Sequence, residues 1–235
     1  MKLVLFDIDG TLVHSGGQAK PVFAEAMLEV FGTAGAIEAY DFSGRTDARI
    51  VVDLAVGAGV PEAEAHDGLP RVRELYLERF ARRFDSRRAR VLPGVERLLD
   101  ALAARPDVAL GLLTGNWRGG ARIKLGGLGL FDRFAFGSFA DDALDRRELP
   151  PIALERARQH TGRAFAAAEA VIVGDSPLDV DCARAHGIPS LAVATGWTER
   201  RALEAEGATW VLDDLTGVFD HPAFSLGAGE PERVR

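Results

Sequence analysis

Two aspartates, Asp7 and Asp9, end the first apolar segment of the chain, residues 1–9. Gly10 and Thr11 follow at once and predict a turn that brings backbone N–H groups close to whatever the carboxylates hold. Side chains alternate along a strand, so this spacing puts both carboxylates on one side, close enough to share a cation or to divide acid–base work. Surface turns often contain Asp-x-Asp, so the pair alone is equally compatible with a turn that does no chemistry.

Thr114, Gly115 and Asn116 follow a second apolar segment, residues 108–113, which predicts another short strand. In open α/β sheets ligands bind beyond the carboxyl ends of the strands. A hydroxyl, a glycine and an amide there suit a loop that holds an anion with backbone N–H groups. The alternative is a Thr or Asn cap that opens the next helix.

Asp175 and Asp179 follow a third apolar segment, residues 170–173. Asp175 is predicted at the strand end, and Asp179 one turn into the next helix. Residues 176–179 also fit a helix capping box, and an acidic first turn suits the helix dipole. That alternative explains Asp179 but not Asp175.

Four carboxylates in one crevice would need a counter-charge. Like charges ~4 Å apart repel by ~4 kcal/mol at an effective dielectric near ~20. A divalent cation would compensate Asp7, Asp9, Asp175 and Asp179. Hard oxygen ligands suit Mg²⁺ better than zinc, and the sequence shows no Cys or His cluster that would compete.

Arg146 and Arg147 place fixed positive charge just ahead of Pro150 and Pro151, which predict the start of a helix. A carboxylate nucleophile, a neighbouring carboxylic acid, a metal and a fixed cation are the parts that move a phosphoryl group through an aspartyl-phosphate. The sequence therefore predicts an enzyme of phosphoryl transfer.

The elements that must position these residues alternate between strand and helix. Short apolar segments predict strands within residues 1–9, 108–113, 134–137, 170–173, 190–194 and 209–212, with helices between the later ones. This alternation is typical of a doubly wound parallel sheet. Residues 15–88 show only helical periodicity and predict an all-helical insertion, whereas residues 221–235 show none and predict a flexible tail.

Composition limits the class of protein. The 235 residues are 47% hydrophobic, enough for a packed core, and the net charge of -7 disfavours a nucleic-acid partner. The single cysteine, Cys182, excludes an internal disulfide framework and fits a reducing compartment. No signal peptide pattern or membrane-length apolar stretch is present, so we expect a cytoplasmic protein without a membrane partner.

Three motifs together resemble those of the haloacid dehalogenase superfamily: Asp-Ile-Asp-Gly-Thr-Leu at residues 7–12, Leu-Thr-Gly-Asn at 113–116, and Gly-Asp-Ser-Pro-Leu-Asp at 174–179. The resemblance covers about residues 1–215 and implies a Rossmann-like core, residues 1–14 and 89–220. The insertion at residues 15–88 looks like the type-one cap of that superfamily, near phosphoglycolate phosphatase and beta-phosphoglucomutase.

The resemblance also implies roles. Asp7 looks like the nucleophile that attacks phosphorus. Asp9 looks like the acid that protonates the leaving oxygen and then the base that activates water. Thr114 and the backbone at Gly115 and Asn116 would bind the transferring phosphoryl oxygens.

The implied metal is Mg²⁺, bound through the Asp7 carboxylate, the Asp9 main-chain carbonyl and Asp175, with Asp179 acting through water. The chain departs from the family at motif three. Where the family usually has a lysine before Pro-x-Pro, the spacing puts Arg147, with Arg146 adjacent, and the sequence does not decide which one faces the site.

Arg45, in the segment 42–47, is the candidate for a cap residue that grips a carboxylate or a second phosphate of the substrate. The alternative is a helix start at this point, with Thr46 or Asp47 as the cap and Arg45 in solvent. We expect the substrate to be a small phosphorylated metabolite and the protein to be a monomer or a homodimer.

Asp9 favours attack on phosphorus over attack on carbon, since expelling an alkoxide from phosphorus benefits from a proton donor. It does not separate a hydrolase from a mutase that transfers phosphoryl within a sugar phosphate. A non-catalytic binding protein on the same fold is the third possibility, and the intact acidic set argues against it.

Overall fold

A parallel sheet of six strands forms the centre of the molecule, and the computed structural model describes residues 1–225. The strand order is β5-β4-β1-β6-β7-β8, and every neighbouring pair is parallel. The strands are β1 (Lys2–Phe6), β4 (Val108–Leu113), β5 (Phe136–Ser138), β6 (Ala170–Gly174), β7 (Ser190–Val193) and β8 (Trp210–Leu212). The prediction of a doubly wound, Rossmann-like core is confirmed.

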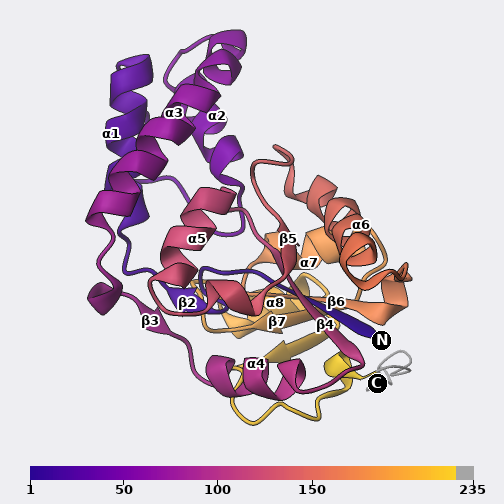
Figure 1. Ribbon diagram of the computed structural model, residues 1–235. Helices are drawn as coiled ribbons and strands as arrows, with labels where there is room; N and C mark the ends of the chain where they lie inside the picture. Colours follow the sequence, from indigo (N-terminus) through magenta and orange to yellow (C-terminus); the bar gives the residue numbers. More distant parts are fainter. Residues whose placement is uncertain (226–235) are drawn as a thin grey trace.

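Helices cover both faces of this sheet (Figure 1). Alternation in β1 is the physical reason, because Val4 and Phe6 belong to one apolar cluster while Leu3 and Leu5 belong to another on the opposite face. Leu98 on α4 (Val95–Ala103) joins the first cluster. The core helices are α4 (Val95–Ala103), α5 (Arg118–Gly126), α6 (Leu149–Thr161), α7 (Pro177–Arg184) and α8 (Arg200–Ala205).

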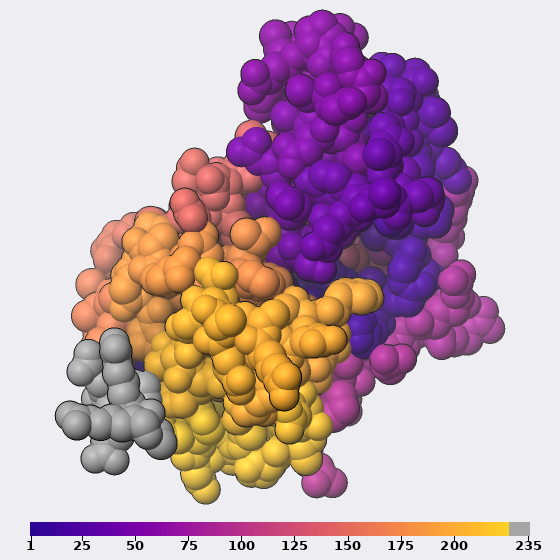
Figure 2. Space-filling view, turned by 180° about the vertical axis from the view of Figure 1, so that it is seen from behind, coloured from indigo at the N-terminus to yellow at the C-terminus, as the bar shows by residue number. Residues whose placement is uncertain are grey.

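Three helices inserted after β1 form the cap: α1 (Ala19–Phe31), α2 (Asp47–Gly57) and α3 (Glu62–Arg83). They pack around a core of their own, in which Phe23, Tyr76 and Phe80 are fully buried. Trp117, from a core loop, belongs to this same cluster and stacks on Phe23 with ring centroids 5.5 Å apart. Figure 2 shows the cap as a lobe that leans over the core.

The two chain segments that join cap and core lie side by side. β2 (Val13–His14) pairs antiparallel with β3 (Arg90–Val91): Val13 lies opposite Val91, and His14 lies opposite Arg90, although the cap separates the two strands along the chain. Two-residue strands are too short for a sequence pattern to predict this pairing. The boundaries of core and cap at residues 14, 15, 88 and 89 remain predictions.

The C-terminal segment differs from its prediction as far as the structure describes it. Pro222–Phe224 form a 3₁₀ turn, and Ala223 and Phe224 are fully buried in the apolar cluster that contains Val4. Burial of one aromatic ring holds this segment although it has no periodicity. The predicted tail residues 226–235 lie outside the described residues. Among residues 1–225, no helix combines the length and the apolar character needed to cross a membrane.

Candidate active site

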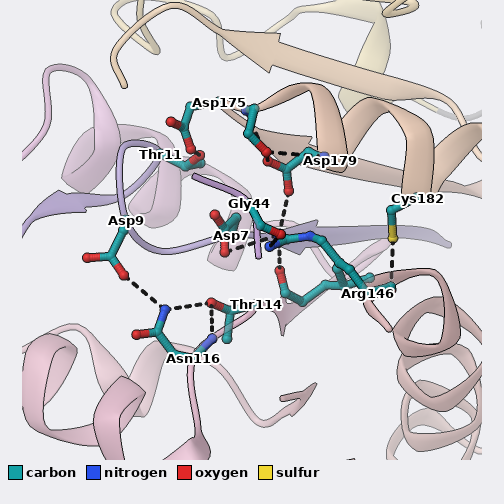
Figure 3. Close-up of polar contacts among 12 residues, drawn as sticks. Asp7, Asp9, Thr11, Gly44, Thr114, Asn116, Arg146, Asp175, Asp179 and Cys182 are labelled. Atoms are coloured by element: carbon teal, nitrogen blue, oxygen red, sulfur yellow. Dashed lines mark hydrogen bonds and ion pairs between the residues drawn. The ribbon is translucent and has the colours of Figure 1, made fainter. Parts of the chain in front are cut away.

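Three of the expected site residues follow neighbouring strands. Asp7 follows β1, Thr114 follows β4, and Asp175 follows β6, and in the sheet β1 lies between β4 and β6. Parallel strands end at the same edge of a sheet, so the order alone brings these side chains together. Figure 3 shows them around one site, together with Asp179 from the first turn of α7.

Asp7, Asp175 and Asp179 form a compact acidic cluster. Each offers a carboxylate oxygen, and these oxygens all lie within 4.8 Å of one another. All three side chains are buried. The Thr11 hydroxyl donates a hydrogen bond of 3.3 Å to Asp175, so the turn after Asp9 contacts the cluster from the side of β1.

Gly10 allows this contact. Its φ of 82° lies in the left-handed region, and a Cβ placed there would come within 2.3 Å of the Asp175 Oδ2. Any larger residue at position 10 would therefore strain the backbone and displace a carboxylate of the cluster.

Among residues 1–225, Arg146 is the cation that pairs with the cluster, and it balances only part of the cluster's charge. Burial is the main cause that raises the pKa of Asp7 to about 6, and the Asp179 carboxylate adds to it, whereas Arg146 opposes it. Burial and the neighbouring carboxylates also raise the pKa of Asp175 well above its ordinary value. Oxygen donors in this arrangement fit a hard divalent cation such as Mg²⁺, whose charge would favour the ionised carboxylates.

Arg146 and Arg147 face in different directions. The Arg146 guanidinium is buried, pairs with Asp179, and lies 3.2 Å from the Asp7 Oδ1 through its Nη2. Its Nη1 donates to the Gly44 carbonyl of the cap at 2.9 Å. Arg147 is exposed, and its Nε donates to Asp181 at 2.6 Å. The structure therefore corrects the inclusion of Arg147 as a candidate catalytic residue, because only Arg146 points into the site.

Asp9 lies apart from the acidic cluster and points toward Asn116 (Figure 3). Its carboxylate accepts hydrogen bonds from Ser15 at 3.0 Å, from the Asn116 amide at 2.9 Å and from Lys124 at 2.6 Å. Burial raises the pKa of Asp9, but Lys124 and these hydrogen bonds outweigh it and hold the pKa below the ordinary value. The metal-binding role expected for the Asp9 carbonyl remains a prediction.

Lys124 is a residue that the sequence analysis missed. It lies on the buried face of α5, three residues after Ala121 and one before Leu125, all of them buried. A lysine among the buried positions of a helix indicates a buried acidic or polar partner, because lysine is almost never fully buried without one.

The loop 114–116 contacts the cap as well as the site. The Asn116 amide donates to the Thr114 hydroxyl at 2.9 Å, and the Gly115 carbonyl accepts from the Asp47 backbone N–H at 2.7 Å. A Cβ at Gly115 would lie 2.1 Å from the Arg45 carbonyl oxygen, so only glycine permits this approach of cap to core. Phosphoryl binding by these residues remains a prediction.

A cavity of about 410 Å³ lies between cap and core. Acidic residues and Arg146 line it from the core, and Phe23, Phe42 and Arg45 line it from the cap. The Arg45 side chain is exposed, with its guanidinium 5.3 Å from the centre of the Tyr40 ring. Thr46 is the N-cap of α2, as the alternative for this segment predicted, and a substrate contact of Arg45 remains a prediction.

Asp47 is a buried cap carboxylate whose position the sequence did not reveal. It accepts a hydrogen bond of 2.7 Å from the Trp117 backbone N–H. Burial raises its pKa to about 7, with Lys124 opposing the rise and Asp9 adding to it. Asp47 therefore belongs to the same electrostatic group as Asp9 and Lys124.

Sheet, cap and acidic cluster together define an α/β enzyme with its site at the carboxyl edge of the strands. The family of haloacid dehalogenase-like hydrolases matches residues 1–187. The chain belongs to this family. The match confirms the resemblance seen in the three motifs and the prediction that the protein is a hydrolase.

Curated relatives match over nearly the whole chain. Phosphoglycolate phosphatase of Rhodospirillum rubrum is 33% identical over 241 residues, which cover 97% of this chain and 94% of that protein. Phosphoglycolate phosphatase of Pseudomonas putida is 28% identical over 221 residues, which cover 93% of this chain and 78% of that protein.

Solved structures agree on the fold. A hydrolase from Pseudomonas syringae superimposes with a TM-score of 0.69 at 22% identity, covering 94% of this chain and 97% of that one. Beta-phosphoglucomutase from Clostridium difficile gives a TM-score of 0.66 at 18% identity, covering 92% of each chain. A hydrolase and a mutase thus share this fold, and the fold alone does not choose between them.

Proposed function

We propose that this protein is a Mg²⁺-dependent phosphatase that hydrolyses a small phosphomonoester. The observation that carries the proposal is the division of the acidic groups. Asp7, Asp175 and Asp179 lie together, while Asp9 lies apart, bonded to Asn116. A nucleophile beside a metal site and a separate proton donor are what the expulsion of an alkoxide from phosphorus requires.

In the proposed reaction, an Asp7 carboxylate oxygen forms a new bond to phosphorus. Its lowered pKa leaves Asp9 ionised in the free site, so Asp9 first takes a proton from the phosphomonoester monoanion as this substrate binds. The bond from phosphorus to the ester oxygen then breaks, and Asp9 gives that proton to the leaving oxygen. Asp9 then takes a proton from a water whose oxygen attacks the aspartyl-phosphate. The bond between phosphorus and Asp7 breaks, inorganic phosphate leaves with the proton that Asp9 took from the water, and both carboxylates return to their starting states.

The other residues would bind and orient. Thr114 and the backbone of Gly115 and Asn116 would hold the phosphoryl oxygens. Arg146 would hold Asp7 in place through their ion pair. Mg²⁺, when bound by the acidic cluster, would neutralise charge on the transferring group.

Phosphoglycolate is the first substrate to test. Curated relatives at 33% and 28% identity carry the name phosphoglycolate phosphatase. Arg45 at the wall of the cavity offers a cation for a carboxylate on the substrate.

A panel of phosphomonoesters that includes phosphoglycolate and β-glucose 1-phosphate tests the proposal. We expect release of inorganic phosphate in Mg²⁺, loss of turnover in excess chelator, and recovery when Mg²⁺ is restored. An isomerised sugar phosphate without free phosphate would identify a mutase. A panel left untouched in Mg²⁺ would favour the non-catalytic alternative. A cytoplasmic location and the choice between monomer and homodimer remain predictions.

A further inference from the structure

Lys124 is a buried lysine at the cavity to which the proposed metal and phosphate binding give no role. Its Nζ lies 2.6 Å from the Asp9 Oδ2 and 2.6 Å from the Asn116 Oδ1. Among the ion pairs of residues 1–225, Asp9 takes part only in this one. The charge that faces the Asp9 carboxylate therefore comes from α5.

Lys124 also fixes the orientation of Asn116. An ammonium group can only donate, so Asn116 must turn its carbonyl oxygen to Lys124 and its NH₂ group to Asp9. That NH₂ group donates to both the Asp9 Oδ2 and the Thr114 hydroxyl, each at 2.9 Å. One lysine thus determines two of the three hydrogen bonds that hold the Asp9 carboxylate, and Ser15 supplies the third.

Exposure separates the two partners. The Asp9 side chain is 28% exposed, whereas that of Lys124 is 6% exposed. Both line the cavity, but the carboxylate is the more accessible of the two to a bound molecule. Arg146 cannot replace Lys124, because its guanidinium is engaged by Asp179 and by the Gly44 carbonyl.

We propose that Lys124 is the positioning residue of the acid–base group: it holds the Asp9 carboxylate at the leaving-group end of the cavity, directly and through Asn116. This inference rests on the proposed phosphatase function and deepens it. In this role Lys124 only donates hydrogen bonds, and the proton that reaches the leaving oxygen comes from Asp9.

The leaving group makes the role measurable. An alkyl phosphate must expel an alkoxide, which needs the Asp9 proton, whereas p-nitrophenyl phosphate expels a stabilised phenolate that leaves without one. The ratio kcat/KM reports the steps up to release of this alcohol or phenol. A misplaced Asp9 therefore lowers kcat/KM for the alkyl phosphate more than for the aryl phosphate.

The experiment compares Lys124→Met with wild type on the best alkyl phosphate of the panel and on p-nitrophenyl phosphate, in saturating Mg²⁺. We expect kcat/KM to fall on the order of 100-fold for the alkyl phosphate and by less than about tenfold for the aryl phosphate. Lys124→Arg keeps a cation beside Asp9, so we expect it to recover most of the loss. Arg122→Met, an exposed cation on the same helix, is the matched control and stays within about twofold of wild type.

Equal losses on the two substrates would overturn the inference, because they would mean a general structural defect or a direct contact of Lys124 with the phosphate. Thermal melting checks the fold of each variant, and Lys124→Gln, which keeps a neutral donor, replaces the methionine variant if that one does not fold. A wild-type protein inactive on every phosphomonoester would reject the proposed function and this inference with it. An active wild type with equal losses in Lys124→Met rejects the inference alone.

Discussion

The two ends of the active site balance charge in different ways. At one end, Asp7, Asp175 and Asp179 share a single buried cation, Arg146, which pairs with two of them. At the other end, Asp9 has Lys124 as its own partner.

This difference indicates which end of the site would need a metal ion to compensate its charge. The acidic cluster keeps an excess of negative charge, and the pKa of Asp7 and Asp175 is raised as a result of burial and of that excess. Asp9 has a lowered pKa, since Lys124 and its hydrogen bonds outweigh its burial. A divalent cation would complete the first end, whereas the second end is complete with protein groups alone.

Asp7→Asn, at the end that holds the acidic cluster, should cause the largest loss of activity. The variant loses the nucleophile but keeps nearly the same volume, so we expect kcat to fall by at least about 10⁴-fold while the fold is kept. The variant also removes one ionisable carboxyl from a crowded buried cluster. We therefore expect its melting temperature without metal to be no lower than that of wild type. Phosphate release and thermal melting, measured beside Asp132→Asn as an exposed control, check both statements. Near-wild-type activity would remove Asp7 from its assigned role.

Arg146→Ala and Arg147→Ala, compared with each other, should show which of the two arginines acts in the site. Arg146 touches Asp7, Asp179 and the cap, so we expect kcat/KM to fall by about 10²- to 10³-fold. Arg147→Ala removes only an exposed pair with Asp181, and we expect activity within about twofold of wild type. Measuring kcat/KM for the two variants side by side gives the answer, and equal losses would contradict the orientation seen in the structure.

The acidic-cluster end of the site could be predicted from the sequence, whereas most of the contacts around Asp9 could not. Asp7, Thr114 and Asp175 could be brought together in advance, because each follows a strand and parallel strands end at one edge. Strand ends are visible in an apolar pattern. The sequence therefore predicted that Asp7 and Asp175 of the acidic cluster lie at one edge of the sheet, as they do in the structure.

Residues on helices and turns were harder to place. Lys124 and Asp47 reach Asp9 from α5 and α2, and their positions depend on how the helices pack and on where the cap lies over the core. The direction of Arg146 depends on a 3₁₀ turn of three residues, too short for any periodicity to reveal its buried side. Tertiary packing, which the local pattern does not contain, decides all three.

Asp47→Asn tests the second end through the pH dependence of stability. The pKa of Asp47 is raised to about 7 in the folded protein from an ordinary 3.8, mainly by burial. Between these values the folded state keeps a proton that the unfolded state has lost. The contribution of Asp47 to the free energy of unfolding is therefore largest below about pH 4, and it falls as the pH rises from there to about 7.

An asparagine does not titrate, so the variant should lose this contribution. Between pH 5 and pH 7, we expect the free energy of unfolding of metal-free wild type to fall by about 1 to 3 kcal/mol more than that of Asp47→Asn. Urea denaturation at the two pH values measures the difference, with Asp67→Asn, an exposed acid of the same cap, as the control. Parallel curves for wild type and Asp47→Asn would mean that Asp47 is not held in the closed position beside Trp117. The cap would then not contribute to the charge around Asp9 and Lys124, and the leaving-group end would consist of core residues alone.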